Sequence, residues 1–309
     1  MKVIVCICTY RRADLLERLL ISLRRIRIEG LNSSEIAVMI VDNYPDGQAR
    51  KVYECVSTQF PIEMVFVEET RRGRPFARNR AIEESLRRNA SFIAFIDDDD
   101  LPEPDWILRL LEKQRETQAD IVCGAMRHNI KGDWPEWVKN SPIFSVSKKR
   151  FETKYSIPRG IGTFNVLIDC RLLANLKSAG PVFNPEFASC GGEDTDFFIR
   201  ARRKGATFAL AENSIIIRSF EDDRLKLNGM LRHAFNLGFY NMKLMKNHTN
   251  FRQVLARRNK ALKKLAASLP AIIFSTFSMK RFTHNLYQTS REIGVLCSYY
   301  RKGIDHDLS

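Results

Sequence analysis

The sequence predicts an α/β fold, in which a mostly parallel β-sheet is covered by helices on both faces. Two patterns in the first hundred residues support it. Four near-continuous apolar runs, at 3–7, 36–41, 62–67 and 92–96, are typical of strands that are buried on both faces. Amphipathic helical segments lie between such runs, and this alternation favours a parallel sheet. In sheets of this kind, ligands bind at the carboxyl ends of the strands.

The elements of the first half follow in order along the chain. The first strand begins at Val3, and leucines at positions 15, 16, 19, 20 and 23 predict a helix after it. The runs 36–41 and 62–67 are the second and third strands. A helix over 75–88, the fourth strand over 92–96 and a helix over 104–117 follow.

The second half of the first 224 residues is less regular. A strand is expected at 120–126, and residues 128–163 then read as an irregular segment with several prolines and glycines. Trp134 and Trp137 in this segment are consistent with plain packing or with a platform on which a sugar ring stacks. A strand at 164–169, a helix at 171–177, a helix within 191–205 that ends at Gly205, and one or two strands within 206–219 complete the series.

The charge of the chain is distributed unevenly. The 309 residues carry a formal net charge of +14. Residues 225–309 contain 15 Lys and Arg against 3 Asp and Glu, whereas residues 1–224 contain 35 against 33. We therefore expect a near-neutral domain over 1–224 and a basic helical C-terminal region over 225–309. Such a region favours an anionic partner, either nucleic acid or the surface of a membrane.

Cysteine usage and apolar stretches bear on where the chain works. Seven cysteines lie at scattered positions without metal-binding or disulfide spacing, which is typical of a reducing, cytoplasmic location. The N-terminal apolar run is too short for an export signal or a membrane span. The stretch 265–279 has 15 residues, contains Pro270 and falls short of the ~20 needed to cross a bilayer. It is expected to be a core or interfacial segment.

Four consecutive aspartates, Asp97–Asp100, follow the fourth strand. Hard divalent cations prefer carboxylate oxygens and keep positions open for phosphate oxygens. This placement therefore predicts a Mg²⁺ or Mn²⁺ site that faces a diphosphate. A solvated turn that caps the helix near Pro104 is the alternative, and it accounts for one or two of the four aspartates.

Three further groups of polar residues stand at positions suited to binding or catalysis. Asp42 ends the second strand, where a carboxylate can accept hydrogen bonds from a ribose or a base, although its neighbours also indicate a turn. Glu193 and Asp194 follow two glycines at a helix start. Apposed carboxylates raise one another's pKa, so such a pair can take up a proton near neutrality; helix capping is the alternative. The arginine-rich stretch 71–80 suits phosphate or base recognition.

Motifs of several other enzyme classes are absent from the sequence. No Gly-x-x-x-x-Gly-Lys loop occurs, which argues against a P-loop kinase or ATPase, and no Gly-x-Gly-x-x-Gly follows the first strand, which argues against a dinucleotide-binding dehydrogenase. The five histidines show no metal spacing, and no Gly-x-Ser-x-Gly turn is present.

Taken together, the ordered motifs resemble those of glycosyltransferase family 2. They are VCICTYRR at the first strand, VDN at the end of the second, GRPFARNRAIEES, AFIDDDDLPEPDWI, GTFNVLIDCRLL and FASCGGEDTDFFIRARRKG, and they span about residues 3–220. Within the family, the chain is most similar to bacterial exopolysaccharide enzymes of the succinoglycan type. The resemblance implies a Rossmann-like GT-A fold and transfer of a sugar from a nucleotide-sugar, expected to be a UDP-sugar.

The resemblance also implies a role for individual residues of the donor site. Thr9 lines the nucleotide pocket, Asp42 hydrogen-bonds the base, and Arg78 and Asn79 lie in the donor site. The catalytic base is matched by Asp194, which removes the proton from the attacking acceptor hydroxyl in a single displacement that inverts the anomeric configuration. A metal ion neutralises the leaving diphosphate.

Within the aspartate run, the family's spacing makes Asp99 the metal ligand and Asp97 the first member of the Asp-x-Asp element, facing the ribose or a metal-bound water. Side chains alternate along an extended strand, so Asp97 and Asp99 can share one face while Asp98 points away. If the chain turns at Asp98, that residue is the ribose partner instead. Asp100 is left as a turn or capping residue.

The sequence also bears on the acceptor and on the role of the basic C-terminal region. The Gln-x-x-Arg-Trp motif of processive synthases is absent after residue 205, so a single transfer is expected, to a saccharide acceptor that is lipid-linked. The enzyme would then work in the cytoplasm, peripherally at the inner face of the plasma membrane, with residues 225–309 either docking on anionic lipid or capping the catalytic domain. A basic nucleic-acid- or membrane-binding protein with an inactive nucleotide-binding fold is the rival interpretation. Because no nucleic-acid-binding motif is found, no nucleic acid partner is expected.

Overall fold

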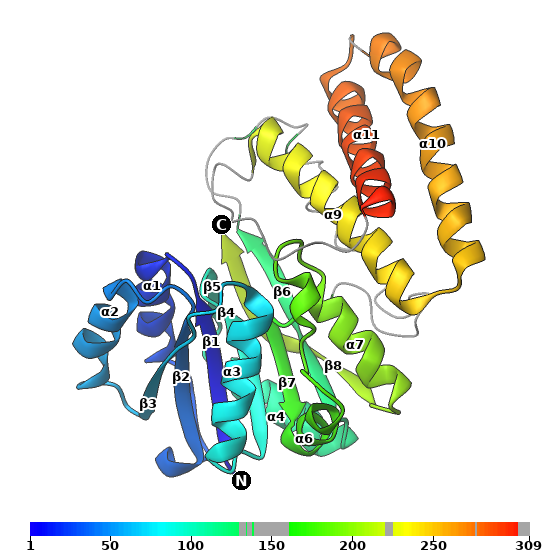
Figure 1. Ribbon diagram of the computed structural model, residues 1–309. Coiled ribbons are helices and arrows are strands. Elements are labelled where there is room, and N and C mark those ends of the chain that lie inside the picture. Colours follow the sequence, from blue (N-terminus) through cyan, green and yellow to red (C-terminus); the bar gives the residue numbers. More distant parts are fainter. Residues whose placement is uncertain (130–133, 135–137, 139–160, 220–224, 276, 302–309) are drawn as a thin grey trace. The chain divides into compact units, whose positions relative to one another are not determined.

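The computed structural model describes residues 1–129, 134, 138, 161–219, 225–275 and 277–301 (Figure 1). Among them, 1–129, 161–189 and 193–219 form one compact unit, and 190–192, 225–275 and 277–301 belong to a second. Each unit is described by itself. Trp137, and with it the suggested sugar-stacking platform, lies outside the described residues.

An eight-stranded sheet forms the centre of the first unit. Its strands are β1 Val3–Thr9, β2 Ile36–Asp42, β3 Glu63–Glu68, β4 Phe92–Asp97, β5 Asp100–Pro102, β6 Ile121–Asn129, β7 Asn165–Asp169 and β8 Phe208–Ser219. Their order is β3-β2-β1-β4-β7-β6-β8-β5. β1 pairs parallel to β2 and β4, β2 to β3, and β6 to β8, whereas β7 is antiparallel to both its neighbours and β5 to β8. The predicted α/β fold is confirmed, with β7 and β5 making the sheet mixed.

Helices cover both faces of the sheet, as Figure 1 shows. Val3, Val5 and Ile7 of β1 pack in one core cluster with α1 (Ala13–Leu23) and α4 (Trp106–Thr117). Side chains alternate along a strand, so Cys6 faces the other side, where its Sγ lies 3.5 Å from Oγ of Ser85 in α3 (Arg74–Arg87). A strand covered on both faces is apolar at every position, which explains the continuous apolar runs of the sequence.

Three features differ in detail from the expected elements. A helix that the sequence pattern did not indicate, α2 (Gln48–Ser57), connects β2 and β3. The stretch 206–219 forms one long strand, β8, and α4 begins at Trp106 rather than near Pro104. The remaining helices of this unit, α6 (Cys170–Ser178) and α7 (Glu193–Arg203), lie where they were expected, and Gly205 follows α7 with a left-handed φ of 89°.

The second unit is a bundle of three helices, α9 (Leu227–His248), α10 (Phe251–Phe274) and α11 (Met279–Tyr300). Gly238 and Gly294 let α9 and α11 approach closely, because a Cβ at Gly238 would collide with the carbonyl of Arg291, and one at Gly294 with the carbonyl of Phe235. Between α10 and α11, the carboxylate of Glu292 is buried and lies 2.7 Å from Nη1 of Arg257. The predicted helical character of residues after 224 is confirmed for the described part.

No described helix has both the length and the apolar character that a membrane span requires. The apolar stretch 265–279 covers the end of α10, the turn after it and the start of α11. This stretch was expected to be a core or an interfacial segment, and the core alternative does not fit Ile273, Phe274 and Phe277, which are 65%, 83% and fully exposed. These residues lie where α10 ends and the turn to α11 follows. In the described part of the second unit, no further helix covers their side chains.

Candidate active site

The polar residues predicted to meet at the sheet edge do so because of the strand register. Thr9 of β1 is paired with Asp42 of β2, and Cys8 of β1 with Asp97 of β4. Since β1, β2 and β4 are parallel, their carboxyl ends point the same way and carry these side chains to one edge. Thr9 and Asp42 are both buried there.

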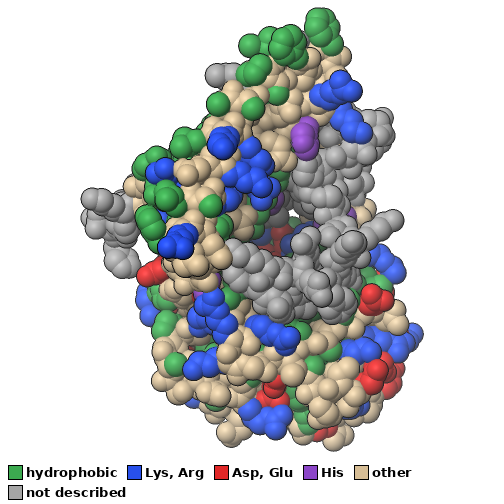
Figure 2. Space-filling view, turned by 90° about the vertical axis from the view of Figure 1, so that its right-hand side faces the viewer, with side chains coloured by type: hydrophobic (Ala, Val, Ile, Leu, Met, Phe, Trp, Pro, Cys, Tyr) green, Lys and Arg blue, Asp and Glu red, His purple; other side chains and the backbone are tan. Residues whose placement is uncertain are grey.

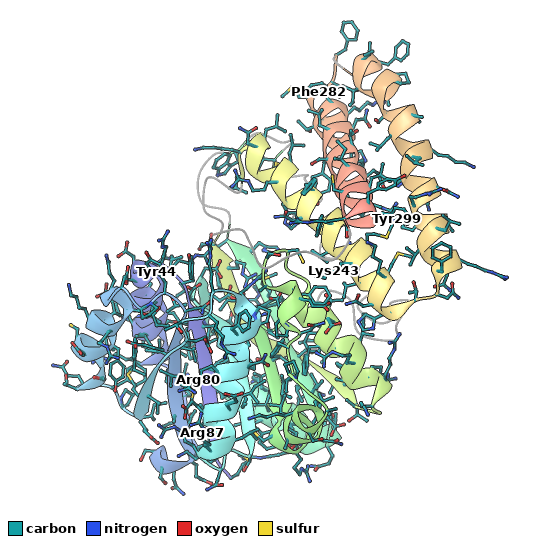
Figure 3. The ribbon with its side chains drawn as sticks, in the orientation of Figure 1. Tyr44, Arg80, Arg87, Lys243, Phe282 and Tyr299 are labelled. Carbon is teal, nitrogen blue, oxygen red and sulfur yellow. The ribbon has the colours of Figure 1, made fainter. Side chains whose placement is uncertain are left out.

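Asp42 offers one oxygen to the protein and keeps the other unused. Its Oδ1 accepts a hydrogen bond from the backbone N–H of Tyr44 at 3.0 Å, whereas Oδ2 is buried and has no hydrogen-bond partner among the described residues. Burial raises the pKa of Asp42, with the Tyr44 N–H opposing this effect. Tyr44 itself lies just beyond β2 (Figure 3), where its ring packs edge-on against Tyr10 at 5.4 Å between centroids, beneath the guanidinium of Arg11. A buried acceptor thus lies beside an aromatic pair.

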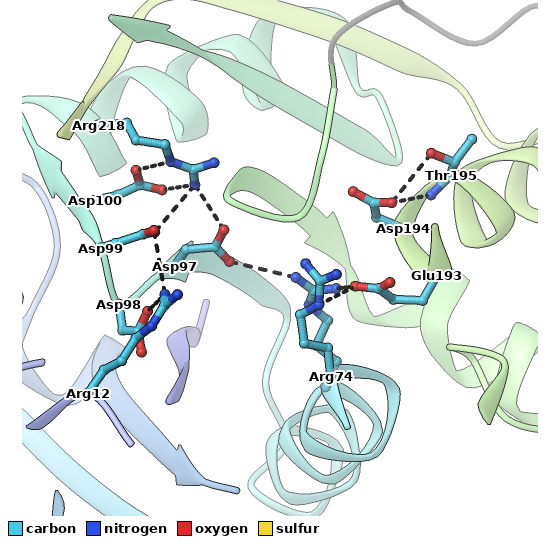
Figure 4. Close-up of polar contacts among 11 residues, drawn as sticks. Arg12, Arg74, Asp97, Asp98, Asp99, Asp100, Glu193, Asp194, Thr195 and Arg218 are labelled. Atoms are coloured by element: carbon cyan, nitrogen blue, oxygen red, sulfur yellow. Dashed lines mark hydrogen bonds and ion pairs between the residues drawn. The ribbon is translucent and has the colours of Figure 1, made fainter. Parts of the chain in front are cut away.

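The four aspartates of the run have four different surroundings (Figure 4). Asp97 is half-buried, and its Oδ2 accepts from Nη2 of Arg218 at 2.9 Å. Asp98 accepts from Oγ1 of Thr9 at 2.9 Å and from Nη1 of Arg12 at 3.1 Å. Burial favours a higher pKa for Asp97, but Arg218 and other guanidinium groups outweigh it and hold that pKa below its ordinary value. Burial raises the pKa of Asp98 to about 6, although Arg12 opposes the rise.

The structure corrects the expected role of Asp100. It was expected to be a spare turn or capping residue, but it begins β5 and is fully buried. Arg218 of β8 donates to both of its oxygens, from Nε at 2.7 Å and from Nη2 at 2.5 Å. Burial raises the pKa of Asp100 to about 8, against the effect of Arg218. The side chain is fixed inside because β5 pairs with β8 and places Asp100 opposite Arg218.

Asp97, Asp99 and Asp100 can each direct one carboxylate oxygen to a common point. These oxygens lie within 4.8 Å of one another. Oxygen donors of this kind fit Mg²⁺ or Mn²⁺. Arg218 contacts all three carboxylates, at 2.5 Å from Asp100, 2.9 Å from Asp97 and 3.7 Å from Asp99. The two residues predicted to be metal ligands, Asp97 and Asp99, both belong to this group. The chain turns over Asp98 and Asp99, yet Asp98 still points away from this pair toward Thr9.

A second group of acids begins helix α7. Glu193 is buried, and its Oε1 lies 2.5 Å from Nη1 of Arg78 and 3.2 Å from Nε of Arg74. Its Oε2 is buried without a hydrogen-bond partner among the described residues. Asp194 is more exposed and accepts from the backbone N–H of Thr195 at 2.7 Å. Burial and the neighbouring Glu193 carboxylate raise the pKa of Asp194, and Arg78 and Arg74 oppose this rise.

Arg78 connects the two groups of acids. It is buried in α3, and besides its contact with Glu193 its Nη2 lies 3.6 Å from Oδ1 of Asp97. The neighbouring Asn79 is placed differently. Its side-chain amide exchanges two hydrogen bonds of 2.8 Å with the backbone of Phe183, donating from Nδ2 and accepting at Oδ1. The structure therefore brings Arg78 to the carboxylates and engages the Asn79 amide with the protein's own backbone.

The loop before α3 positions the start of this helix, and with it Arg74 and Arg78. Gly73 has a φ of 132°, and a Cβ at this position would come within 2.7 Å of the Cβ of Ala188, so glycine is required. Asn43 accepts from the N–H of Gly73 at 2.8 Å and donates to the carbonyl of Arg71 at 2.7 Å. Pro75 stands in the first turn of α3, where its missing N–H is not needed.

Comparison with known proteins gives this arrangement a family. A family model described as "Glycosyl transferase family 2" matches residues 4–169, more than half of the chain. The chain belongs to this glycosyl transferase family. A curated relative, the succinoglycan biosynthesis protein ExoM of Rhizobium meliloti (strain 1021), is 29% identical over 236 residues, which is 75% of this chain and 71% of the relative. The predicted family, and the predicted likeness to exopolysaccharide enzymes, are confirmed.

Solved structures of glycosyltransferases share the fold. The mannosyltransferase PcManGT from Pyrobaculum calidifontis, in complex with GDP-Man and Mn²⁺, has a TM-score of 0.64 at 16% identity, over 97% of this chain and 87% of that one. S. aureus TarS 1-349 in complex with UDP-GlcNAc has a TM-score of 0.55 at 15% identity, over 97% of this chain and 93% of that one. At these identities the likeness concerns the fold, and it confirms the predicted GT-A architecture. The family makes the chain a glycosyltransferase.

Sequence reasoning missed three arginines of the site. Arg218 was not singled out. It follows the apolar run III, just as the aspartates follow the run FIAFI, so the same signal was present in the sequence. Arg12 was not singled out either, and it contacts Asp98 and Asp99. Arg74 belongs to the arginine-rich stretch 71–80, in which spacing alone does not distinguish the residues that reach the site from solvated ones.

Proposed function

We propose that this glycosyltransferase is a metal-dependent, inverting enzyme that transfers one sugar from a nucleotide-sugar, with a UDP-sugar as the expected donor, to a saccharide acceptor. The observation that carries the proposal is the position of Arg78, which contacts Asp97 of the aspartate run on one side and Glu193, next to Asp194, on the other. Asp97, a member of the acidic group suited to a cation, thus lies on one side of a buried guanidinium. On the other side lies Glu193, and burial and the Glu193 carboxylate raise the pKa of the neighbouring Asp194.

The donor side of the site rests on residues at the ends of β1 and β2. The unpartnered Oδ2 of Asp42 can accept a hydrogen bond from a nucleobase N–H, and the imide N–H of uracil is a donor of this kind. The rings of Tyr10 and Tyr44 lie close by and offer apolar surface to a base. Thr9 reaches the donor site through Asp98, whose carboxylate it orients toward the ribose side.

The diphosphate side of the site rests on carboxylates and guanidinium groups. A divalent ion held by Asp99 and Asp97 would supply positive charge against the leaving diphosphate. Arg218 fixes Asp97 at 2.9 Å and Asp100 at 2.5 Å, and so holds the carboxylates of the run in place. Arg12 does the same for Asp98 from the side of α1.

The acceptor side rests on Asp194. A general base must be ionised at the working pH yet basic enough to take a proton, and a carboxylate of raised pKa meets both needs better than an ordinary aspartate. Asp194 would accept the proton of the acceptor hydroxyl while that oxygen attacks the anomeric carbon. The bond to the diphosphate oxygen breaks in the same displacement, so the anomeric configuration inverts and no sugar is bound covalently to the enzyme.

The likeness to the succinoglycan biosynthesis protein supports a role in bacterial exopolysaccharide synthesis. In that setting the acceptor is a lipid-linked saccharide, and the enzyme works in the cytoplasm at the inner face of the plasma membrane. The uneven charge of the chain supports this location, because residues 225–309 carry most of its +14 net charge. The division into a catalytic domain over 1–224 and a basic helical region over 225–309 is part of the proposal.

Thermal unfolding with a panel of nucleotide-sugars, with and without Mn²⁺, tests the proposal. We expect one UDP-sugar to raise the Tm, more so with Mn²⁺, because a ligand that binds only the folded state stabilises it. Asp99→Asn should lose the effect of Mn²⁺, whereas Asp194→Asn should keep donor binding and lose transfer. Asp14→Asn, at an exposed position in the first turn of α1, is the matched control.

Two outcomes would contradict the proposal. One is that no nucleotide-sugar shifts the Tm while the chain shows salt-sensitive binding to nucleic acid, which would favour the rival class. The other is that Asp194→Asn retains near-normal turnover, which would exclude this residue as the base.

A further inference from the structure

The turn between α10 and α11 exposes a compact apolar group. Ile273 and Phe274 end α10, Phe277 lies in the turn and Met279 begins α11, and all four are mostly solvent-exposed. We call these four residues the hairpin tip. In Figure 2, hydrophobic side chains gather at the upper end of the view, and in Figure 3 the side chains at this turn project away from both helices.

The hairpin tip is held in shape by hydrogen bonds of the turn itself. Asn285 of α11 donates from Nδ2 to the carbonyl of Ala271 at 3.0 Å and to Oγ of Ser275 at 3.2 Å. The N–H of Ser278 donates to the carbonyl of Ser275 at 2.9 Å, and Ser275 is buried. Hydrogen bonds therefore hold the described residues Ser275 and Ser278 between the two helices, while the large side chains of Phe274 and Phe277 are exposed.

A buried apolar cluster of the second unit lies away from the tip. It consists of Met242, Val254, Ala261 and Val295, which are well along the helices from the turn. The tip residues are thus not the continuation of a seam that a neighbouring helix of this unit covers. Contiguous exposed apolar side chains of this size mark a binding surface.

The charge around the tip indicates what it binds. Residues 251–291 contain nine Lys and Arg and no Asp or Glu. Lys280 and Arg281 are exposed within about one helical turn of Phe277. Lys263 lies 11 residues before Phe274, which is about 16 Å along the helix. A second copy of the chain would bring the same positive charge to the contact, so self-association through the tip is disfavoured, and an anionic surface is favoured.

We propose that the hairpin tip docks on an anionic lipid bilayer, end-on, with Phe274 and Phe277 inserted below the phosphate level and Lys280 and Arg281 at the phosphates. Apolar side chains of interfacial elements enter a bilayer by about 5–10 Å, which matches the reach of phenyl rings from a turn. Lys or Arg near an anionic surface strengthens binding, and the more distant cations of α10 add attraction that salt weakens.

This end-on geometry differs from a helix that lies flat on the membrane. A flat amphipathic helix carries apolar residues along its whole length on one face. Among the α10 side chains that the structure describes, the strongly exposed large apolar ones are Phe251 at the start and Ile273 and Phe274 at the end, and Leu262 lies between them at 43% exposure. The apolar surface suited to lipid is therefore concentrated at the turn.

Vesicle binding of the full chain tests the proposal. The chain is incubated with vesicles of neutral phosphatidylcholine, or of phosphatidylcholine with about one third phosphatidylglycerol, and binding is measured by co-sedimentation. We expect binding to the anionic vesicles only, decreasing with salt. The Phe274→Ser/Phe277→Ser variant should bind at least tenfold more weakly, because burial of a phenyl ring changes a partition constant by on the order of tenfold or more. Lys280→Glu/Arg281→Glu should also weaken binding.

Phe251→Ser is the matched control, since Phe251 is 70% exposed at the opposite end of the same helix, and this variant should bind like the wild type. Equal binding to neutral vesicles, no binding by the wild type, or unchanged binding by the Phe274→Ser/Phe277→Ser variant would overturn the proposal. So would a wild-type dimer in solution that this variant converts to monomers, because the tip would then bind a second copy. No nucleotide-sugar is present in the assay, so its result is independent of the proposed transfer reaction.

Discussion

The ion pair between Arg78 and Glu193 provides a test of how the site is held together. Arg78 is 4% exposed and Glu193 1%, and Nη1 lies 2.5 Å from Oε1. Arg78→Met keeps an apolar chain of similar length and removes the guanidinium. Among the described ion pairs of Glu193, its carboxylate then keeps the one with Arg74, whose side chain is 64% exposed and 3.2 Å away. Breaking a buried pair by removing one partner costs about 3–5 kcal/mol, because an uncompensated charge stays behind.

The expected shift in a urea titration follows from this figure. Proteins with cores of this size lose roughly 2–3 kcal/mol of unfolding free energy per molar urea. The variant should therefore unfold at a midpoint roughly 1–2 M lower, at nearly unchanged slope. Trp106, fully buried in the first unit, reports the transition of that unit by fluorescence.

Arg74→Met is the matched control, because it removes a guanidinium from the same carboxylate at an exposed position. Exposed pairs contribute about 0–1 kcal/mol, so the midpoint should fall by less than about 0.5 M. The double variant Arg78→Met/Glu193→Gln should recover part of the loss, since no charge is left unpaired. Equal shifts for the two single variants, or an Arg78→Met variant within about 1 kcal/mol of the wild type, would refute the reasoning.

Three further predictions concern the base, the nucleobase contact and the helical unit. Because burial and Glu193 raise the pKa of Asp194, kcat/KM should fall as the pH drops through a value above the ordinary 3.8 of an aspartate. Glu193→Gln should move this acidic limb of the pH–rate profile to lower pH. An unchanged limb would exclude an effect of Glu193 on the pKa of Asp194. Asp42→Asn should weaken donor binding by about tenfold in a calorimetric titration, because Oδ2 loses its charge, while stability is retained; undiminished affinity would remove Asp42 from the donor site. Gly294→Ala should destabilise the second unit by about 1–3 kcal/mol in thermal unfolding, since the added Cβ would collide with the carbonyl of Phe235, and an unchanged Tm would show that α9 and α11 can separate freely.

The sequence was sufficient to predict the sheet and its functional edge. A strand covered on both faces leaves a continuous apolar run, and polar residues that end such runs meet at the carboxyl edge. Asp42 and Asp97 were placed at strand ends on this reasoning, and the register of β1 with β2 and β4 brings them to one edge together with Thr9. The helix that begins at Glu193 was also predicted from local sequence, because two glycines and acidic residues mark its start.

The features that were missed depend on contacts between distant parts of the chain. Asp100 was taken for a turn residue because four adjacent aspartates look alike, and only the pairing of β5 with β8 buries it against Arg218. Arg218 is 118 residues away in sequence, so no local pattern links the two. Helix α2 was missed because its first residues follow plain turn chemistry at Asp46 and Gly47.

The anomeric configuration of the released sugar tests the central claim most directly. In the absence of a known acceptor, water can take the place of the acceptor hydroxyl, and early proton NMR spectra show which anomer of the sugar forms before it equilibrates. With an α-linked UDP-sugar and Mn²⁺, single displacement assisted by Asp194 predicts the β-anomer first, no reaction after chelation of the metal, and little reaction in Asp194→Asn. Initial release of the α-anomer, or undiminished release without metal, would contradict the account.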